Sequence, residues 1–136
     1  MQDRAIAEKD KFLVKVGLAI FLTGGTPKIG LVKNKDGKYR VPSQDLSTGE
    51  NCFDVANKVL NESCGIDRTS PFSLELATCI SDSEQLYLIF SLYVKQGSDF
   101  NEELVFFDSE ESADLYFKNE FDQNHGEVVR AAIQNG

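Results

Sequence analysis

The chain has 136 residues, of which 41% are hydrophobic and 26% charged. This length suits one domain with its own hydrophobic core, and the composition is typical of a folded protein rather than a disordered one. The formal net charge of −8 would repel a polyanion, which argues against sequence-independent nucleic-acid binding. No apolar run reaches the roughly 18 residues that a membrane helix needs, and the N-terminus lacks the apolar core of a secretory signal. We therefore expect a cytoplasmic protein with an N-terminal extension over residues 1–11 and a single domain over residues 12–134.

The N-terminal part of this domain is predicted to form strands. Apolar residues recur at every second position from Lys11 to Leu22, which is the period of a strand with at least one buried face. Turn residues at 23–27 and 34–37 separate this strand from two further strands, over residues 28–33 and 39–41.

A helix is predicted next, from near Thr48 to near Cys64. Ser47 and Glu50 have the spacing of a capping box, which satisfies unpaired N–H groups at a helix start. Gly65 follows, where a left-handed C-terminal cap suits glycine. Residues at helical spacing form one apolar face, which we expect to be buried against the strands: Phe53, Ala56, Leu60 and Cys64.

The C-terminal half is predicted to contain three strands, over residues 73–80, 85–95 and 104–107, and two helices, over residues 110–117 and 124–134. The strand at 85–95 is apolar on both faces, which is typical of the centre of a sheet. Asp108 or Ser109 is expected to cap the first of the two helices. The predicted class is α+β.

The loop and helix from Gln44 to Ile66 resemble the box of the Nudix hydrolases, whose pattern is G-x5-E-x7-R-E-U-x-E-E-x-G-U, with U an aliphatic residue. Aligned without a gap, Glu50 matches the first glutamate, Leu60 the central aliphatic residue and Glu62 the first of the paired glutamates. Four residues depart from the pattern. Gln44 replaces the opening glycine and Lys58 the arginine, while Val59 and Ser63 each replace a glutamate. The order of elements over most of the chain also resembles the Nudix fold, which implies an α/β/α sandwich with a mixed sheet, the box helix and a C-terminal helix.

The resemblance implies a site where Mg²⁺ or Mn²⁺ is held against a pyrophosphate. At about 100° per residue, positions 52, 59, 62 and 63 share one arc of the helix, on which the family presents its metal-binding carboxylates. Only Glu62 is a carboxylate on this arc. Since Mg²⁺ prefers oxygen ligands in a near-octahedral array, we expect weak metal binding.

The candidate catalytic residues are Glu62 and Glu50, and each has a structural alternative. Glu62 is either a metal ligand or a solvated helix residue, and Glu50 is either catalytic or part of the capping box. Some Nudix enzymes take a carboxylate from a loop after the box, so Glu102 or Glu103 could supplement Glu62. The alternative for these two residues is a solvated acidic surface.

Basic residues gather before the box, and these could face a phosphate: Lys28, Lys33, Lys35, Lys38 and Arg40. Arg40 and Lys38, with Gly49, are the candidate ligand-binding residues, although lysines in turns are commonly only solvated. His125 is the only histidine, and we expect it to have a capping or surface role rather than to act as a general base.

The three cysteines are predicted to be small, mostly buried apolar residues. Cys52 and Cys64 lie twelve residues apart on one predicted helix, and this spacing corresponds to about 18 Å, well beyond the roughly 7 Å limit for a disulfide between Cα atoms. Cys79 falls in a predicted strand. No Cys/His cluster indicates zinc.

Three function hypotheses follow. In the first, the protein binds a small nucleoside-diphosphate-type ligand or a partner, with lost or strongly weakened hydrolysis. In the second, it is a divergent Mg²⁺-dependent hydrolase of a nucleoside diphosphate linked to another group. In the third, it is a non-catalytic structural or interaction domain. Neither nucleic acid nor a membrane is an expected partner, and the oligomeric state is open, with a homodimer as one option.

Overall fold

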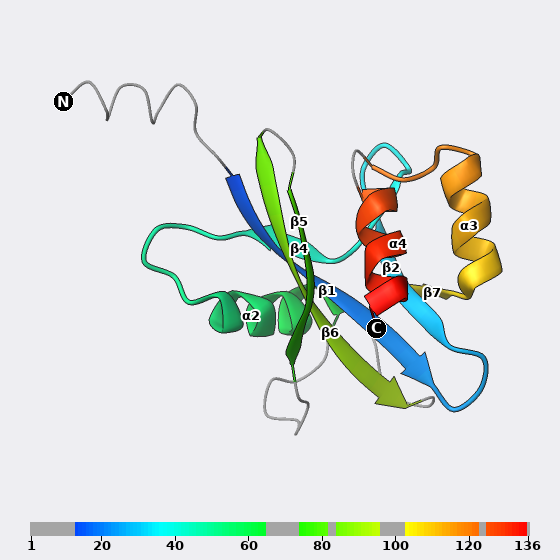
Figure 1. Ribbon diagram of the computed structural model, residues 1–136, viewed down its shortest axis with the longest axis horizontal. Helices are drawn as coiled ribbons and strands as arrows, with labels where there is room; N and C mark the ends of the chain where they lie inside the picture. The colour runs from blue at the N-terminus through cyan, green and yellow to red at the C-terminus, as the bar shows by residue number, and fades with distance from the viewer. Residues whose placement is uncertain (1–12, 65–73, 82–83, 96–102, 123–124, 136) are drawn as a thin grey trace.

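The structure, a computed structural model, describes residues 13–64, 74–81, 84–95, 103–122 and 125–135 (Figure 1). Its centre is a seven-stranded mixed sheet. The strands are β1 (Leu13–Thr23), β2 (Lys28–Lys33), β3 (Tyr39–Arg40), β4 (Ser43–Asp45), β5 (Glu75–Ser81), β6 (Gln85–Lys95) and β7 (Val105–Phe107). The helices are α2 (Cys52–Cys64), α3 (Ser109–Phe117) and α4 (His125–Asn135).

The strands β1 and β6 form the middle of the sheet. They pair in parallel along their whole length, and β5 continues the sheet as an antiparallel neighbour of β6. On its other side β1 pairs antiparallel with β4 near its start and with β2 near its end. β2 then pairs with both β3 and β7. The prediction that residues 85–95 lie at the centre of the sheet is confirmed.

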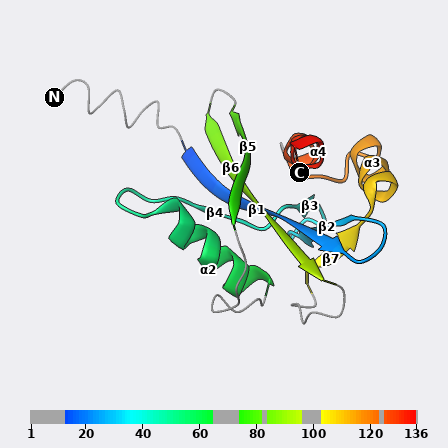
Figure 2. The same ribbon diagram turned by 60° about the horizontal axis from the view of Figure 1, so that its bottom comes forward.

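Helices cover both faces of this sheet, with α2 on one face and α3 and α4 on the other (Figure 2). Each face carries its own hydrophobic cluster, because residues that alternate along a strand point to opposite faces. On β1, Leu18 and Ile20 lie in the cluster under α2, while Ala19 and Phe21 lie in the cluster under α4. The result is the α+β sandwich that the element order predicts.

The prediction for the buried face of α2 is partly wrong. Ala56 and Leu60 are buried as expected, but Phe53 is 49% exposed. The helix is rotated so that Val55 and Val59 reach the core instead. The ring of Phe53 still contacts the ring of Phe90 on β6, with centroids 5.0 Å apart.

Two further expectations need correction. Cys79 is exposed rather than buried, because it lies on β5, which is an edge strand of the sheet among the described residues. The short strand β4 was not predicted from the sequence, and it pairs with β1 at three consecutive positions.

The helices within the described ranges include none that is both long and apolar enough to cross a membrane.

Candidate functional site

The loop before α2 is held by its own side chains, and the predicted start of the helix is wrong by four residues. The helix begins at Cys52, not near Thr48, because Asn51 is its cap. The Oδ1 atom of Asn51 accepts from the backbone N–H groups of Phe53 at 2.8 Å and Asp54 at 3.4 Å. Asparagine at this position satisfies N–H groups that have no partner within the helix.

Glu50 takes part in the turn rather than in the helix cap. Its Oε1 atom accepts from the backbone N–H of Ser47 at 2.7 Å, and its own N–H donates to the Ser47 carbonyl at 3.0 Å. Gly49 lies between them with a φ of +87°, a left-handed conformation that glycine adopts without a steric penalty. One carboxylate oxygen of Glu50 is thus committed to the loop backbone.

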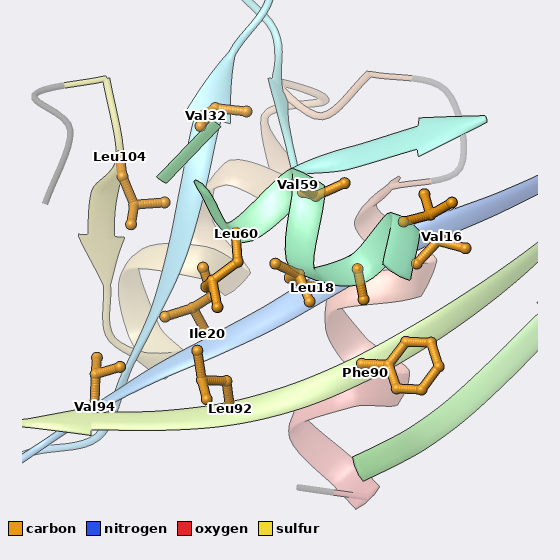
Figure 3. Packing of buried hydrophobic residues seen from close by; sticks show 12 residues of the cluster. Val16, Leu18, Ile20, Val32, Val59, Leu60, Phe90, Leu92, Val94 and Leu104 are labelled. Atoms are coloured by element: carbon orange, nitrogen blue, oxygen red, sulfur yellow. The ribbon is translucent and has the colours of Figure 1, made fainter. Parts of the chain in front are cut away.

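Val59 occupies the box position where the family pattern has a glutamate, and its side chain is in the core. It is 0% exposed and lies in one cluster with Leu18, Ile20 and Val32. Figure 3 shows Leu60 pointing from α2 toward Leu18 and Ile20, with Val59 in the same cluster. This part of the helix arc therefore faces protein and not a solvated cleft.

The exposed side of α2 carries Asp54, Lys58 and Glu62 at intervals of four residues, so they follow one another along the same face. Two shallow hollows lie along this face, of about 230 Å³ beside Glu50 and about 660 Å³ beside Glu62. Asp54 and Lys58 line both of them. Lys58 thus lies on the same exposed face as Asp54 and Glu62.

These residues do not fit a divalent-metal site. No group of three or more His, Cys, Asp or Glu side chains that could hold a metal ion occurs among the residues that the structure describes. Glu50 is hydrogen-bonded to Ser47, Val59 is apolar, and Lys58 adds a positive charge to the face that carries Glu62. Since Mg²⁺ needs several oxygen ligands, Glu62 has no group of carboxylates around it, among the described residues, that would complete its coordination.

The candidate phosphate-binding residues are not brought together. Arg40 pairs with Val32 across β2 and β3, and paired residues point to the same face of a sheet, so Arg40 lies on the α2 face. Lys38 instead donates from Nζ to the carbonyl of Asn119 at 2.7 Å. Gly49 lines the smaller hollow beside Glu50. Of the three predicted residues, only Arg40 and Gly49 lie on the side of the box helix.

Two candidate carboxylates come from the segment before β7. Glu103 is exposed in the turn before this strand, and Glu102 lies outside the described residues. Further along, Asp108 accepts from the N–H of Glu111 at 2.8 Å, and Glu111 accepts from the N–H of Asp108 at 3.0 Å. This reciprocal capping box selects Asp108 from the two predicted caps of α3, Asp108 and Ser109.

His125 is buried, and the expectation of a surface role is wrong. Its Nδ1 atom accepts from the backbone N–H of Val41 at 3.2 Å, and its ring meets the Tyr87 ring edge to face at 5.3 Å. Burial lowers the pKa of His125 to about 4, and the positive charges of Arg40 and Lys15 act in the same direction.

The sequence did carry a signal for this burial. His125 stands three, four and seven residues before the apolar positions of α4, which are Val128, Val129 and Ala132, and all four residues are buried on one face. A neutral imidazole that accepts a backbone hydrogen bond joins α4 to the chain just after β3. Its role in this position is structural.

A mixed sheet between one helix and a pair of helices defines an α+β sandwich, and comparison with solved structures identifies its type. A MutT/Nudix family protein from Listeria innocua superposes with a TM-score of 0.71 at 15% identity, covering 90% of this chain and 92% of that one. The Nudix domain of Shewanella oneidensis NrtR, complexed with ADP ribose, superposes with a TM-score of 0.66 at 13% identity, covering 98% of this chain and 97% of that one.

A C. elegans Ap4A hydrolase in a binary complex superposes with a TM-score of 0.68 at 11% identity, covering 88% of this chain and 93% of that one. No family model matches the sequence, and no curated protein is significantly similar to it. The protein has the Nudix fold.

Proposed function

We propose that this protein is a Nudix-fold binding protein whose hydrolytic activity is lost or strongly weakened, and that it binds a nucleoside-diphosphate-type ligand. The observation that carries the proposal is Val59. A glutamate at this position of the box pattern would lie on the metal-binding arc, whereas Val59 is fully buried among core residues.

The other box residues support the same proposal. Nudix-type hydrolysis needs a metal to polarise the pyrophosphate and to activate water. The carboxylate of Glu50 is bound to the Ser47 amide, and Lys58 shares the exposed face with Glu62. An ammonium in that place repels Mg²⁺ but attracts a phosphate, so the face favours binding over hydrolysis.

The choice of ligand rests on similarity and on Arg40. Among proteins of the same fold, the NrtR domain was crystallised with ADP ribose, and another is named an Ap4A hydrolase. Arg40 lies on the α2 face, and a guanidinium can bind a phosphate through two parallel hydrogen bonds. We propose that Arg40 and Lys58 contact the phosphates of the ligand.

The test combines a turnover assay with a binding assay on the purified protein. ADP-ribose and Ap4A are incubated with Mg²⁺ or Mn²⁺ and followed by chromatography, and their binding is measured by calorimetry without metal. We expect no turnover above background, measurable binding, and roughly tenfold weaker binding for Arg40→Ala. Lys35→Ala, which removes an equal charge from an exposed turn, is the matched control and should change binding by less than twofold.

Two outcomes would contradict the proposal in different ways. Metal-dependent hydrolysis that disappears in Glu62→Gln would favour a divergent hydrolase that uses Glu62. The absence of both turnover and binding, for a protein with an intact fold, would favour a structural or interaction domain.

A further inference from the structure

The chain that follows α3 holds the short strand β3 through its backbone. Strand β3 consists of Tyr39 and Arg40 only. The N–H of Tyr39 donates to the carbonyl of Glu120 at 2.8 Å, and the carbonyl of Tyr39 accepts from the N–H of Asp122, also at 2.8 Å. The two segments form a parallel β-bridge and lie side by side (Figure 1). The backbone directly before Arg40 is therefore fixed by the chain that follows α3.

His125 fixes the backbone directly after Arg40. The Nδ1 atom of its imidazole accepts from the N–H of Val41 at 3.2 Å. Both residues are buried, so water does not replace this acceptor, and a buried N–H without an acceptor is costly. Since His125 is the first residue of α4, the hydrogen bond ties the start of this helix to the chain beside Arg40.

The pairing of β3 with β2 is too short to place Arg40 by itself, because it covers only two positions. Arg40 pairs with Val32, which belongs to the cluster under α2, whereas Val41 belongs to the cluster under α4. Neighbouring residues of an extended chain point to opposite faces of a sheet. The contacts from the α4 side therefore hold the backbone, while the side chain of Arg40 lies on the face that carries the box helix.

The protonation state of His125 suits its role as an acceptor. Burial lowers the pKa of His125 to about 4, Asp122 acts to raise it, and the positive charges of Arg40 and Lys15 lower it further. The imidazole is therefore neutral at pH 7, and a neutral imidazole keeps one nitrogen that can accept a hydrogen bond. The charge of Arg40 thus acts on His125 across the sheet, in addition to the backbone link through Val41.

We propose that His125 is a positioning residue for the ligand site on the box face, because it holds the backbone that carries Arg40. The inference rests on the proposed function, in which Arg40 binds a phosphate of the ligand. Two parallel hydrogen bonds from a guanidinium require a defined orientation, and a group that is already oriented loses less free energy on binding. Removing the acceptor of the Val41 N–H should therefore weaken ligand binding, although His125 lies on the opposite face of the sheet from the ligand.

The test compares two variants of His125 by calorimetry with ADP-ribose at pH 7, without metal. His125→Leu keeps an apolar side chain but removes the acceptor. It should weaken binding roughly two- to tenfold, the range that corresponds to the loss of one hydrogen bond. His125→Asn keeps an acceptor, because Oδ1 of asparagine lies close to the position of Nδ1, and it should bind within about twofold of the wild type.

Val129→Ala is the matched control for a general loss of stability. Val129 is buried in the same cluster as Val41, and its truncation leaves the imidazole in place. Like His125→Leu, it should unfold at a lower urea concentration than the wild type, because it leaves a cavity in the core. Its affinity for ADP-ribose should nevertheless stay within about twofold of the wild type.

Two-dimensional NMR gives a measurement that needs no ligand. The amide signal of Val41 and the Nε–H signal of Arg40 should both shift in His125→Leu, whereas the Arg40 signal should stay in place in Val129→Ala. If His125→Leu loses the dispersed spectrum of a folded protein, His125→Gln takes its place, with the same expected loss of affinity. The amide of glutamine reaches past the position of Nδ1 and does not replace this acceptor.

Three results would overturn the proposal, given a wild type that binds ADP-ribose and an Arg40→Ala variant that binds it more weakly. The first is that folded His125→Leu binds as tightly as the wild type. The second is that Val129→Ala weakens binding as much as His125→Leu, which would make the effect a general loss of stability. The third is that His125→Asn binds as weakly as His125→Leu, so that the acceptor is not what matters.

Failure of the proposed function gives a different result, because the wild type then does not bind ADP-ribose at all. In that case the Nε–H signal of Arg40 decides the inference. A shift of this signal in His125→Leu, but not in Val129→Ala, would support the positioning of Arg40 by His125. An unchanged signal in His125→Leu would overturn it.

Discussion

Replacing Val59 by glutamate restores the family's residue at that box position, and we predict that it destabilises the fold without creating a metal site. The side chain is 0% exposed and packs in the cluster between α2 and the sheet. Loss of its burial costs about 2 kcal/mol. An unpaired carboxylate in the same place adds several kcal/mol more. The sum is a large part of the roughly 5–15 kcal/mol that stabilises a typical domain.

The assay is urea unfolding of the wild type, Val59→Glu and Asn61→Glu. Asn61→Glu places the same charge on an exposed position of the same helix and should stay within about 0.5 kcal/mol of the wild type. The free energy of unfolding of Val59→Glu should be lower than that of the wild type by about 4 kcal/mol or more at pH 7. This difference should shrink as the pH falls, because burial raises the pKa of a carboxyl and protonation removes the buried charge.

A Val59→Glu protein that is as stable as the wild type at pH 7 would refute this reasoning, since the side chain would then face water. Gain of Mg²⁺ affinity in the double variant with Ser63→Glu would strengthen that refutation. It would indicate a decayed active site that two substitutions can restore.

Three other predictions can be checked with the same protein. Calorimetry should give Mg²⁺ affinity in the roughly millimolar range or weaker, and micromolar binding abolished by Glu62→Gln would instead favour the hydrolase. His125 has a folded-state pKa of about 4, lowered from 6.5. The part of the free energy of unfolding that depends on a neutral His125 is therefore fully present above pH 6.5 and is lost as the pH falls through 4. Urea unfolding at a series of pH values should show that the free energy of unfolding falls by roughly 3 kcal/mol, and this fall should be missing in His125→Gln. Equal slopes of the free energy of unfolding against pH in the two proteins would contradict the prediction. Asn51→Ala should cost about 1 kcal/mol because it removes the cap of α2, whereas Asn51→Asp should unfold at nearly the wild-type urea concentration; equal midpoints for all three proteins would show that the cap contributes nothing.

Local patterns in the sequence determined most of the elements of this protein. Strand β6 was predicted with its observed bounds, because its apolar residues fill both faces of a central strand. The cap of α3 was predicted as Asp108 or Ser109, since a side-chain acceptor before a helix acts on its nearest N–H groups, and the structure has Asp108. The end of α2 at Cys64 was also predicted. The Nudix fold was indicated by the box spacing and the element order, although four residues of the box depart from the pattern.

The tertiary structure decided what depends on contacts between distant residues. Spacing alone allowed two apolar faces on α2, one containing Phe53 and the other Val59, and docking on β1 selected the second. The burial of His125 depends on Val41, which is 84 positions away. Tyr93, Phe21, Ile29 and Phe107 lie in one row only because β6, β1, β2 and β7 are in register. Such pairings are set by which surfaces bury the most apolar area together, and no single segment of the sequence contains that information.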